Sequence, residues 1–156
     1  MHYKYLLITG LLGAILPLLY SGCTTTEINT DPIFDLEPQI KLESFSSSSI
    51  VQFTDSLAVE ISYEDGDGDL GSTDPDFNSI FVQDARLAKA DEYYVPPLAP
   101  EDATISIQGK LQINLAPTFL LGNGTQETTT YSLYMIDRAG NQSNTIEIGP
   151  ISILKE

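Results

Sequence analysis

The residues best suited to chemistry form an acidic loop, residues 64–71, which reads Glu-Asp-Gly-Asp-Gly-Asp-Leu-Gly. Asp65, Asp67 and Asp69 place three carboxylates at alternate positions, where their charges repel unless a cation or solvent separates them. Glycines let the backbone turn, and a flexible loop of oxygen ligands suits Ca²⁺, which takes about six to eight of them. The sequence therefore predicts a Ca²⁺ site, with a merely solvated acidic turn as the alternative.

This loop resembles the start of an EF-hand or thrombospondin-type calcium loop, in which Asp-x-Asp-x-Asp supplies the first ligands. It departs from the EF-hand at Leu70, where that family requires glycine, because Gly71 comes one residue late. Asp76 stands where the EF-hand has a bidentate glutamate. The resemblance implies coordination by carboxylates but does not favour a complete EF-hand.

Scarce residue types exclude several kinds of active site. His2 is the only histidine, Cys23 is the only cysteine, and tryptophan is absent. If His2 is removed with a signal peptide, the remaining chain cannot build a Ser-His-Asp triad, a Cys-His dyad or a His/Cys zinc site. Glycoside hydrolysis needs one acid with a raised pKa in a water-poor cleft, whereas most acids here stand in Gly-, Pro- and Ser-rich turns. We therefore predict a protein that is not an enzyme.

Charge is distributed very unevenly along the chain. All 22 acidic residues follow Cys23, and Lys4 is the only Lys or Arg before it, so the chain from Cys23 onward has a formal charge of −16. This charge repels phosphate backbones, and no nucleic-acid partner is expected. It also disfavours binding to anionic lipid headgroups, so attachment to a membrane needs a different cause.

The N-terminus has the features of a signal peptide. Lys4 precedes an apolar run, residues 6–20, which would reach only about 22 Å as a helix, against about 30 Å of hydrocarbon in a bilayer. Pro17 further disfavours a permanent membrane span. A short positive start, an apolar run and small residues after it are typical of a segment that is removed on export.

Small residues followed by a lone cysteine, Ser21-Gly22-Cys23, resemble the lipobox of bacterial lipoproteins, although Tyr20 stands where a smaller aliphatic residue is usual. The resemblance implies removal of residues 1–22 and a diacylglycerol thioether on Cys23, with palmitate-type acyl chains. Each buried CH₂ contributes about 0.8 kcal/mol, so two or more chains anchor a protein stably in a membrane.

Residues 23–38 contain two prolines, several threonines and no steady hydrophobic period, and we expect them to form a flexible tether. Thr24 stands where aspartate would signal retention in the inner membrane of some bacteria, so the resemblance favours the outer membrane. Surface-exported lipoproteins of Bacteroidota-type bacteria often carry an acidic pair here. Only Glu27 is acidic nearby, and the periplasmic and surface faces both stay open.

From residue 39 to residue 156 the dominant pattern is alternation of apolar and polar residues, the period of a half-buried strand. Pro150 indicates a break or an edge strand in the last segment, and Gly109 a bulge or a close packing point. About seven short strands separated by turns favour an antiparallel β-sandwich. The expected strands are 40–45, 57–63, 80–83, 93–95, 105–115, 131–135 and 146–153.

Residues 131–148, with Asp-Arg-Ala-Gly-Asn at the turn, resemble the last hairpin of immunoglobulin-like and fibronectin-type-III-like bacterial surface domains. The same turn and the acidic loop also resemble uncharacterised lipoproteins of Bacteroidota-type bacteria. An immunoglobulin-like layout places this turn and the acidic loop at one end of the sandwich. The expected Ca²⁺ ligands are therefore Asp65, Asp67, Asp69, Asp137 and Asn141.

Two weaker candidate sites lie elsewhere. Tyr93 and Tyr94 precede two prolines, and exposed tyrosines can stack on sugars or contact a protein partner. The favoured interpretation is that one ring faces the core, the other covers a sheet edge, and the prolines block edge pairing. Asp-Ser-Leu at Ser56 resembles the O-glycosylation acceptor of Bacteroidota-type bacteria. We expect a structural or protein-interaction module; the alternative is an accessory glycan-binding lipoprotein of a polysaccharide-uptake system, which the absence of tryptophan disfavours.

Overall fold

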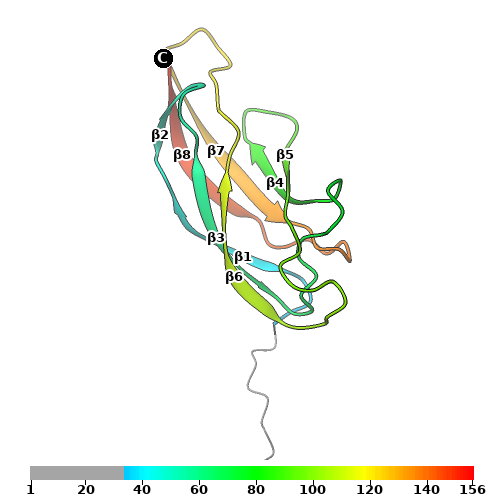
Figure 1. The fold of residues 1–156 in the computed structure, drawn as a ribbon. Helices are drawn as coiled ribbons and strands as arrows, with labels where there is room; N and C mark the ends of the chain where they lie inside the picture. The colour runs from blue at the N-terminus through cyan, green and yellow to red at the C-terminus, as the bar shows by residue number, and fades with distance from the viewer. Residues whose placement is uncertain (1–33) are drawn as a thin grey trace, which may run out of the picture. The chain divides into compact units, whose positions relative to one another are not determined.

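Eight β-strands build residues 34–156, the part of the chain that the computed structural model describes (Figure 1). The all-β prediction is confirmed, and two sheets are consistent with a sandwich. No helix among these residues is long and apolar enough to cross a membrane. The predicted signal peptide, Cys23 and the tether up to residue 33 lie outside the described residues.

One sheet has three strands in the order β1-β3-β6, and the other has five in the order β2-β8-β7-β4-β5. All pairings are antiparallel except the short parallel pair β2–β8. The bounds are β1 Gln39–Phe45, β2 Ser49–Val51, β3 Ala58–Asp65, β4 Asn78–Asp84, β5 Asp91–Tyr94, β6 Ile107–Asn114, β7 Gln126–Met135 and β8 Ile146–Leu154.

Alternation along β3 decides which side chains face the core. Val59, Ile61 and Tyr63 are buried, and they pack in one core with Leu133 of β7 and residues of β8. Successive strand side chains point to opposite faces, so the next inward position after Tyr63 is Asp65. Asp65 is the last residue of β3 and is 0% exposed. The strand thus delivers a carboxylate to a core position at one end of the sandwich.

The sequence-based interpretation of Pro150 is wrong. β8 runs without interruption from Ile146 to Leu154 and lies inside its sheet, between β2 and β7. β2 pairs only with residues 152–154, so Pro150 lies beyond the end of that partner. On the β7 side it falls where the register shifts between Ile148 and Ile151. Its missing N–H therefore removes no ladder hydrogen bond.

Gly109 is a close packing point rather than a bulge, because β3 and β6 pair there without a register shift. Tyr63 is its direct cross-strand partner, and a Cβ on Gly109 would lie 2.6 Å from the Tyr63 hydroxyl oxygen. We expect Gly109→Ala to lower the free energy of unfolding by about 1–3 kcal/mol through overpacking, measured by urea denaturation.

Gly124→Ala is the matched control for this substitution. Its new methyl group would meet no atom closer than 3.5 Å, and we expect a change within about 0.5 kcal/mol. If Gly109→Ala costs no more than this control, the Tyr63 ring moves aside freely and the packing argument is incorrect.

Candidate cation site

Three carboxylates from two parts of the chain meet where β3 ends. Asp65, Asp69 and Asp137 each offer an oxygen, and these oxygens all lie within 4.8 Å of one another. Asp65 and Asp137 are both 0% exposed, and Asp69 is half-buried. The expectation that acids in this Gly-rich segment occupy exposed turns is therefore wrong for Asp65, because the β3 alternation carries it inward.

The loop that follows β3 is held by close backbone contacts. Gly68 has φ +75°, a conformation that L side chains rarely adopt, and a Cβ there would lie 2.5 Å from the Ile105 carbonyl oxygen. The Ile105 amide in turn donates to the Asp67 carbonyl. Glycine is thus required at residue 68 because the backbone at Ile105 approaches the loop so closely. This contact sets the direction of Asp67 and Asp69.

Residues 137–141 form the other wall of the site. Asp137 Oδ1 accepts from the Asn141 amide at 2.7 Å, and Asp137 Oδ2 accepts from Asn141 Nδ2 at 2.9 Å. The Ala139 amide donates to Asp69 Oδ2 at 2.9 Å, and the Arg138 amide donates to the Asp69 carbonyl. This turn therefore orients two of the three carboxylates from one side.

Unsatisfied buried oxygens concentrate in this site. Five buried side-chain atoms of the described residues have no hydrogen-bond partner, and four of them are Asp65 Oδ1, Asp65 Oδ2, Asp67 Oδ1 and Asp69 Oδ1. Buried polar atoms in folded proteins nearly always have a partner, because leaving one unpaired costs about 1–3 kcal/mol and more if it is charged. The site thus lacks a positive or hydrogen-donating group that these oxygens would bind.

The pKa shifts of these buried carboxylates agree with the lack of hydrogen-bond partners on these oxygens. Burial, together with the charge on Asp67, raises the pKa of Asp65. The nearby amides of Asp69 and Leu70 face the carboxylate without the geometry of a full hydrogen bond, and they offset this rise only in part. Burial and the charge on Asp137 raise the pKa of Asp69 to about 6. A divalent cation among these groups would favour their ionised forms and remove the repulsion.

The remaining predicted ligands take different places. Asp67 contributes one buried, unpartnered oxygen beside Asp65, as a ligand would. Asn141 donates through both of its N–H groups to Asp137, so it positions that carboxylate. Asp76, the counterpart of the EF-hand glutamate, is exposed and lies outside the group of three carboxylates. The geometry is that of a loop and a hairpin turn, not of an EF-hand.

In metal-free protein we expect the melting temperature to fall as the pH rises from about 4.5 to about 7. The pKa of Asp69 is about 6 in the folded chain against an ordinary 3.8. In this window the folded state therefore keeps a proton that the unfolded chain has lost, and stability declines as that proton leaves. The raised pKa of Asp65 acts in the same direction.

Thermal melts in a chelator across this window measure the effect, and Asp69→Asn should flatten the profile. A wild-type melting temperature that stays constant or rises between these pH values would contradict the assignment of a buried, protonatable carboxylate.

The weaker predicted sites show ordinary local roles. The Tyr93 hydroxyl accepts from the Ala116 amide at 3.0 Å, and the Tyr94 hydroxyl donates to the Ser72 carbonyl at 2.8 Å. Both rings border a groove of about 230 Å³ between β5 and β6. The rings offer a contact surface there, but both hydroxyls are already hydrogen-bonded within the protein. Ser56 is exposed in the connection between β2 and β3, where a modification would meet no obstacle.

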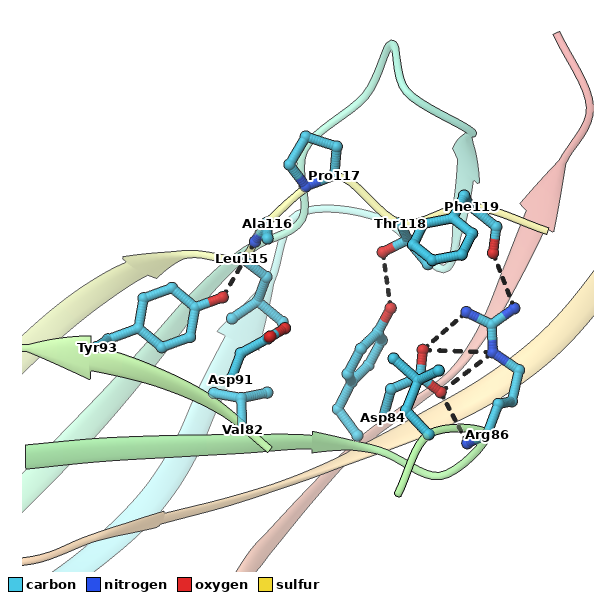
Figure 2. A pocket seen from close by; sticks show the side chains of 12 residues that line it. Val82, Asp84, Arg86, Asp91, Tyr93, Leu115, Ala116, Pro117, Thr118 and Phe119 are labelled. Carbon is cyan, nitrogen blue, oxygen red and sulfur yellow. Dashed lines mark hydrogen bonds and ion pairs between the residues drawn. The ribbon is translucent and has the colours of Figure 1, made fainter. Parts of the chain in front are cut away.

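A second polar cluster, which the sequence pattern does not predict, surrounds Arg86 beside a small cavity of about 50 Å³ (Figure 2). Arg86 forms ion pairs with Asp84 and Glu127, each at 2.7 Å, and donates to the Phe119 carbonyl at 3.1 Å. Nearby, the Thr118 and Tyr131 hydroxyls share a hydrogen bond of 2.7 Å. Because these groups satisfy one another, the cluster is structural, and the acidic site remains the candidate for binding.

No protein family, curated protein or solved structure matches this chain.

Proposed function

We propose that this chain is a lipid-anchored, non-enzymatic lipoprotein of the bacterial envelope, whose immunoglobulin-like sandwich acts as a structural or protein-interaction module and binds Ca²⁺ through Asp65, Asp67, Asp69 and Asp137. The observation that carries the cation site is Asp65, which is 0% exposed and has no hydrogen-bond partner on either carboxylate oxygen. The lipobox resemblance at Cys23 supports the anchor, and the arrangement into two mainly antiparallel sheets supports the immunoglobulin-like assignment.

The chemistry of the ligands favours Ca²⁺ over transition metals. All four side chains offer carboxylate oxygens, and hard oxygen ligands in a glycine-containing loop suit Ca²⁺ or Mg²⁺ rather than zinc or copper. Mg²⁺ demands near-ideal octahedral geometry and retains several waters, which a buried group such as Asp65 accommodates poorly. We therefore expect Ca²⁺ to bind more tightly than Mg²⁺, with a dissociation constant of about 10⁻⁴–10⁻³ M, as in extracellular modules.

Calorimetric titration of the full-length protein in a non-ionic detergent tests the cation site. Ca²⁺ at about 10 mM should stabilise the fold by about 1.4–2.7 kcal/mol at the expected affinity, because only the folded state assembles the site. The corresponding rise in melting temperature is ~4–10 °C. Absence of binding heat together with an unchanged melting temperature would refute Ca²⁺ binding.

Mass spectrometry of the protein from native membranes tests the anchor separately. We expect a mature chain that begins at Cys23 and carries the mass of a diacylglycerol thioether. An intact Met1, or a Cys23 thiol without acyl chains, would remove the envelope role but leave the cation site as a property of the domain.

A further inference from the structure

The backbone of the N-terminal segment, which we define as residues 34–40, lies directly against the acidic loop. A Cβ on Gly66 would lie 2.5 Å from the Asp35 carbonyl oxygen and 2.6 Å from that of Phe34. Gly66 is flanked by Asp65 and Asp67, which carry three of the buried, unpartnered oxygens. The backbone that carries Asp65 and Asp67 therefore contacts the N-terminal segment directly.

A second connection runs through Asn144, which follows the 137–141 turn. Its Oδ1 accepts from the Ile40 amide at 2.8 Å and its Nδ2 donates to the Ile40 carbonyl at 2.9 Å, so one side chain clamps the start of β1. Ser143, its neighbour, is tied to Met135 by two hydrogen bonds, between backbone groups and through Ser143 Oγ. One wall of the cation site thus contacts the N-terminal segment directly, through Gly66, and the other is joined to it through Asn144, three residues after the 137–141 turn.

Without a cation, the carboxylates of Asp65, Asp69 and Asp137 repel one another at short range, and the flanking glycines allow the loop to move away. With a cation, the repulsion is replaced by attraction, and both walls are drawn together. We propose that Ca²⁺ binding locks the N-terminal segment onto the domain, so that ion occupancy and docking of residues 34–40 are thermodynamically linked. This inference rests on the proposed Ca²⁺ site.

The linkage would regulate the reach of an anchored domain. Docked, the segment leaves the residues between Cys23 and Phe34 as the connection to the lipid; released up to Ile40, it adds about six residues, or ~20 Å of extended chain. Ca²⁺ would then shorten the connection and restrict the orientation of the domain, whereas Ca²⁺ depletion would lengthen it.

Hydrogen exchange on the full-length protein in detergent, followed by mass spectrometry, tests this inference. Saturating Ca²⁺ should slow amide exchange in residues 34–40 by about 5- to 150-fold, the range of typical couplings between sites. The peptide of the inner strand β8, Ile146–Leu154, is the internal reference, and its exchange rate should change much less. Linkage is reciprocal, so release of the segment by Asn144→Ala should weaken Ca²⁺ affinity by up to the factor by which Ca²⁺ strengthens docking.

Asn123→Ala is the matched control variant, because Asn123 is exposed in the connection between β6 and β7. It should retain both the Ca²⁺ affinity and the Ca²⁺-dependent protection of wild type. Ca²⁺ heat in calorimetry without slower exchange in residues 34–40 would overturn the inference and leave the proposed function intact. Absence of Ca²⁺ heat together with an unchanged melting temperature would overturn both this inference and the proposed Ca²⁺ site.

Discussion

Replacing Arg86 with alanine should lower the free energy of unfolding by about 3–5 kcal/mol, because it removes the partner of a buried charge. The Arg86 side chain is only 15% exposed, and Asp84, which it contacts at 2.7 Å, is 6% exposed. After the substitution, Asp84 keeps only the Thr129 hydroxyl and the backbone amide of residue 86 as donors. Neither group carries a positive charge.

Arg86 also joins three segments that are distant in sequence. It leaves the turn after β4 and donates to the Phe119 carbonyl in the connection between β6 and β7 (Figure 2). It also reaches Glu127 near the start of β7. Glu127 in turn accepts from the amides of Leu121 and Gly122. Loss of the guanidinium therefore releases a loop as well as an ion pair, which places the expected effect at the upper end of single substitutions.

Urea denaturation of Arg86→Ala beside Lys110→Ala measures this effect against a matched control. Lys110 also bridges two carboxylates, Glu43 and Glu60, but its side chain is 59% exposed, and surface pairs contribute about 0–1 kcal/mol. Arg86→Lys should fall between the two, because lysine keeps the charge but loses the forked geometry. Equal losses for the alanine variants would show that the Arg86 cluster is no stronger than a surface pair.

Acid should weaken the same cluster. Burial raises the pKa of Asp84, but hydrogen bonds from Arg86 and Thr129 outweigh it, and the pKa lies below the ordinary 3.8. A lowered pKa in the folded state contributes stability that is present above the ordinary pKa and is lost as the pH falls below it. This loss of stability in acid occurs below the pH range, about 4.5 to 7, in which titration of Asp69 is expected to lower the melting temperature.

Hydrophobic alternation predicts local structure in this chain because it depends on near neighbours. Val59, Ile61 and Tyr63 alternate with polar residues, and β3 lies there. The same period, continued by one step, places Asp65 inward. The glycines after Asp65 are a competing signal in the sequence, because they favour an exposed turn. The sequence thus identifies the carboxylates of the loop, whereas the burial of Asp65 follows only when the alternation is continued to the end of β3.

Features that depend on distant partners could not be predicted in this way. β2 has only three residues and no alternation of its own, and it exists because residues 152–154 of β8 pair with it. The Arg86 cluster depends on Glu127, which is 41 residues away in sequence. The Asn144 clamp joins residues separated by 104 positions. Each arises from sheet pairing, which local pattern does not specify.

Replacing Asp65 with asparagine should raise the stability of the fold in chelator and abolish its stabilisation by Ca²⁺. In chelator, an unpaired ionised carboxylate costs several kcal/mol on burial, whereas a neutral amide costs about 1–3, so the variant should be more stable than wild type by at least about 1 kcal/mol. For a domain of this size that is ~3–5 °C in melting temperature. In Ca²⁺, the variant should gain nothing, because a fully buried ligand has lost its charge.

Asp76→Asn is the control that separates a cation site from a general effect of acidity. It removes the same charge eleven residues further on, at an exposed position outside the carboxylate group. It should leave the free energy of unfolding in chelator, and the stabilisation by Ca²⁺, within about 0.5 kcal/mol of wild type. A merely solvated acidic cluster would respond alike to both substitutions, whereas a buried cation site makes only Asp65→Asn stabilising without Ca²⁺ and unresponsive with it. Paired thermal melts of the three proteins decide between these outcomes.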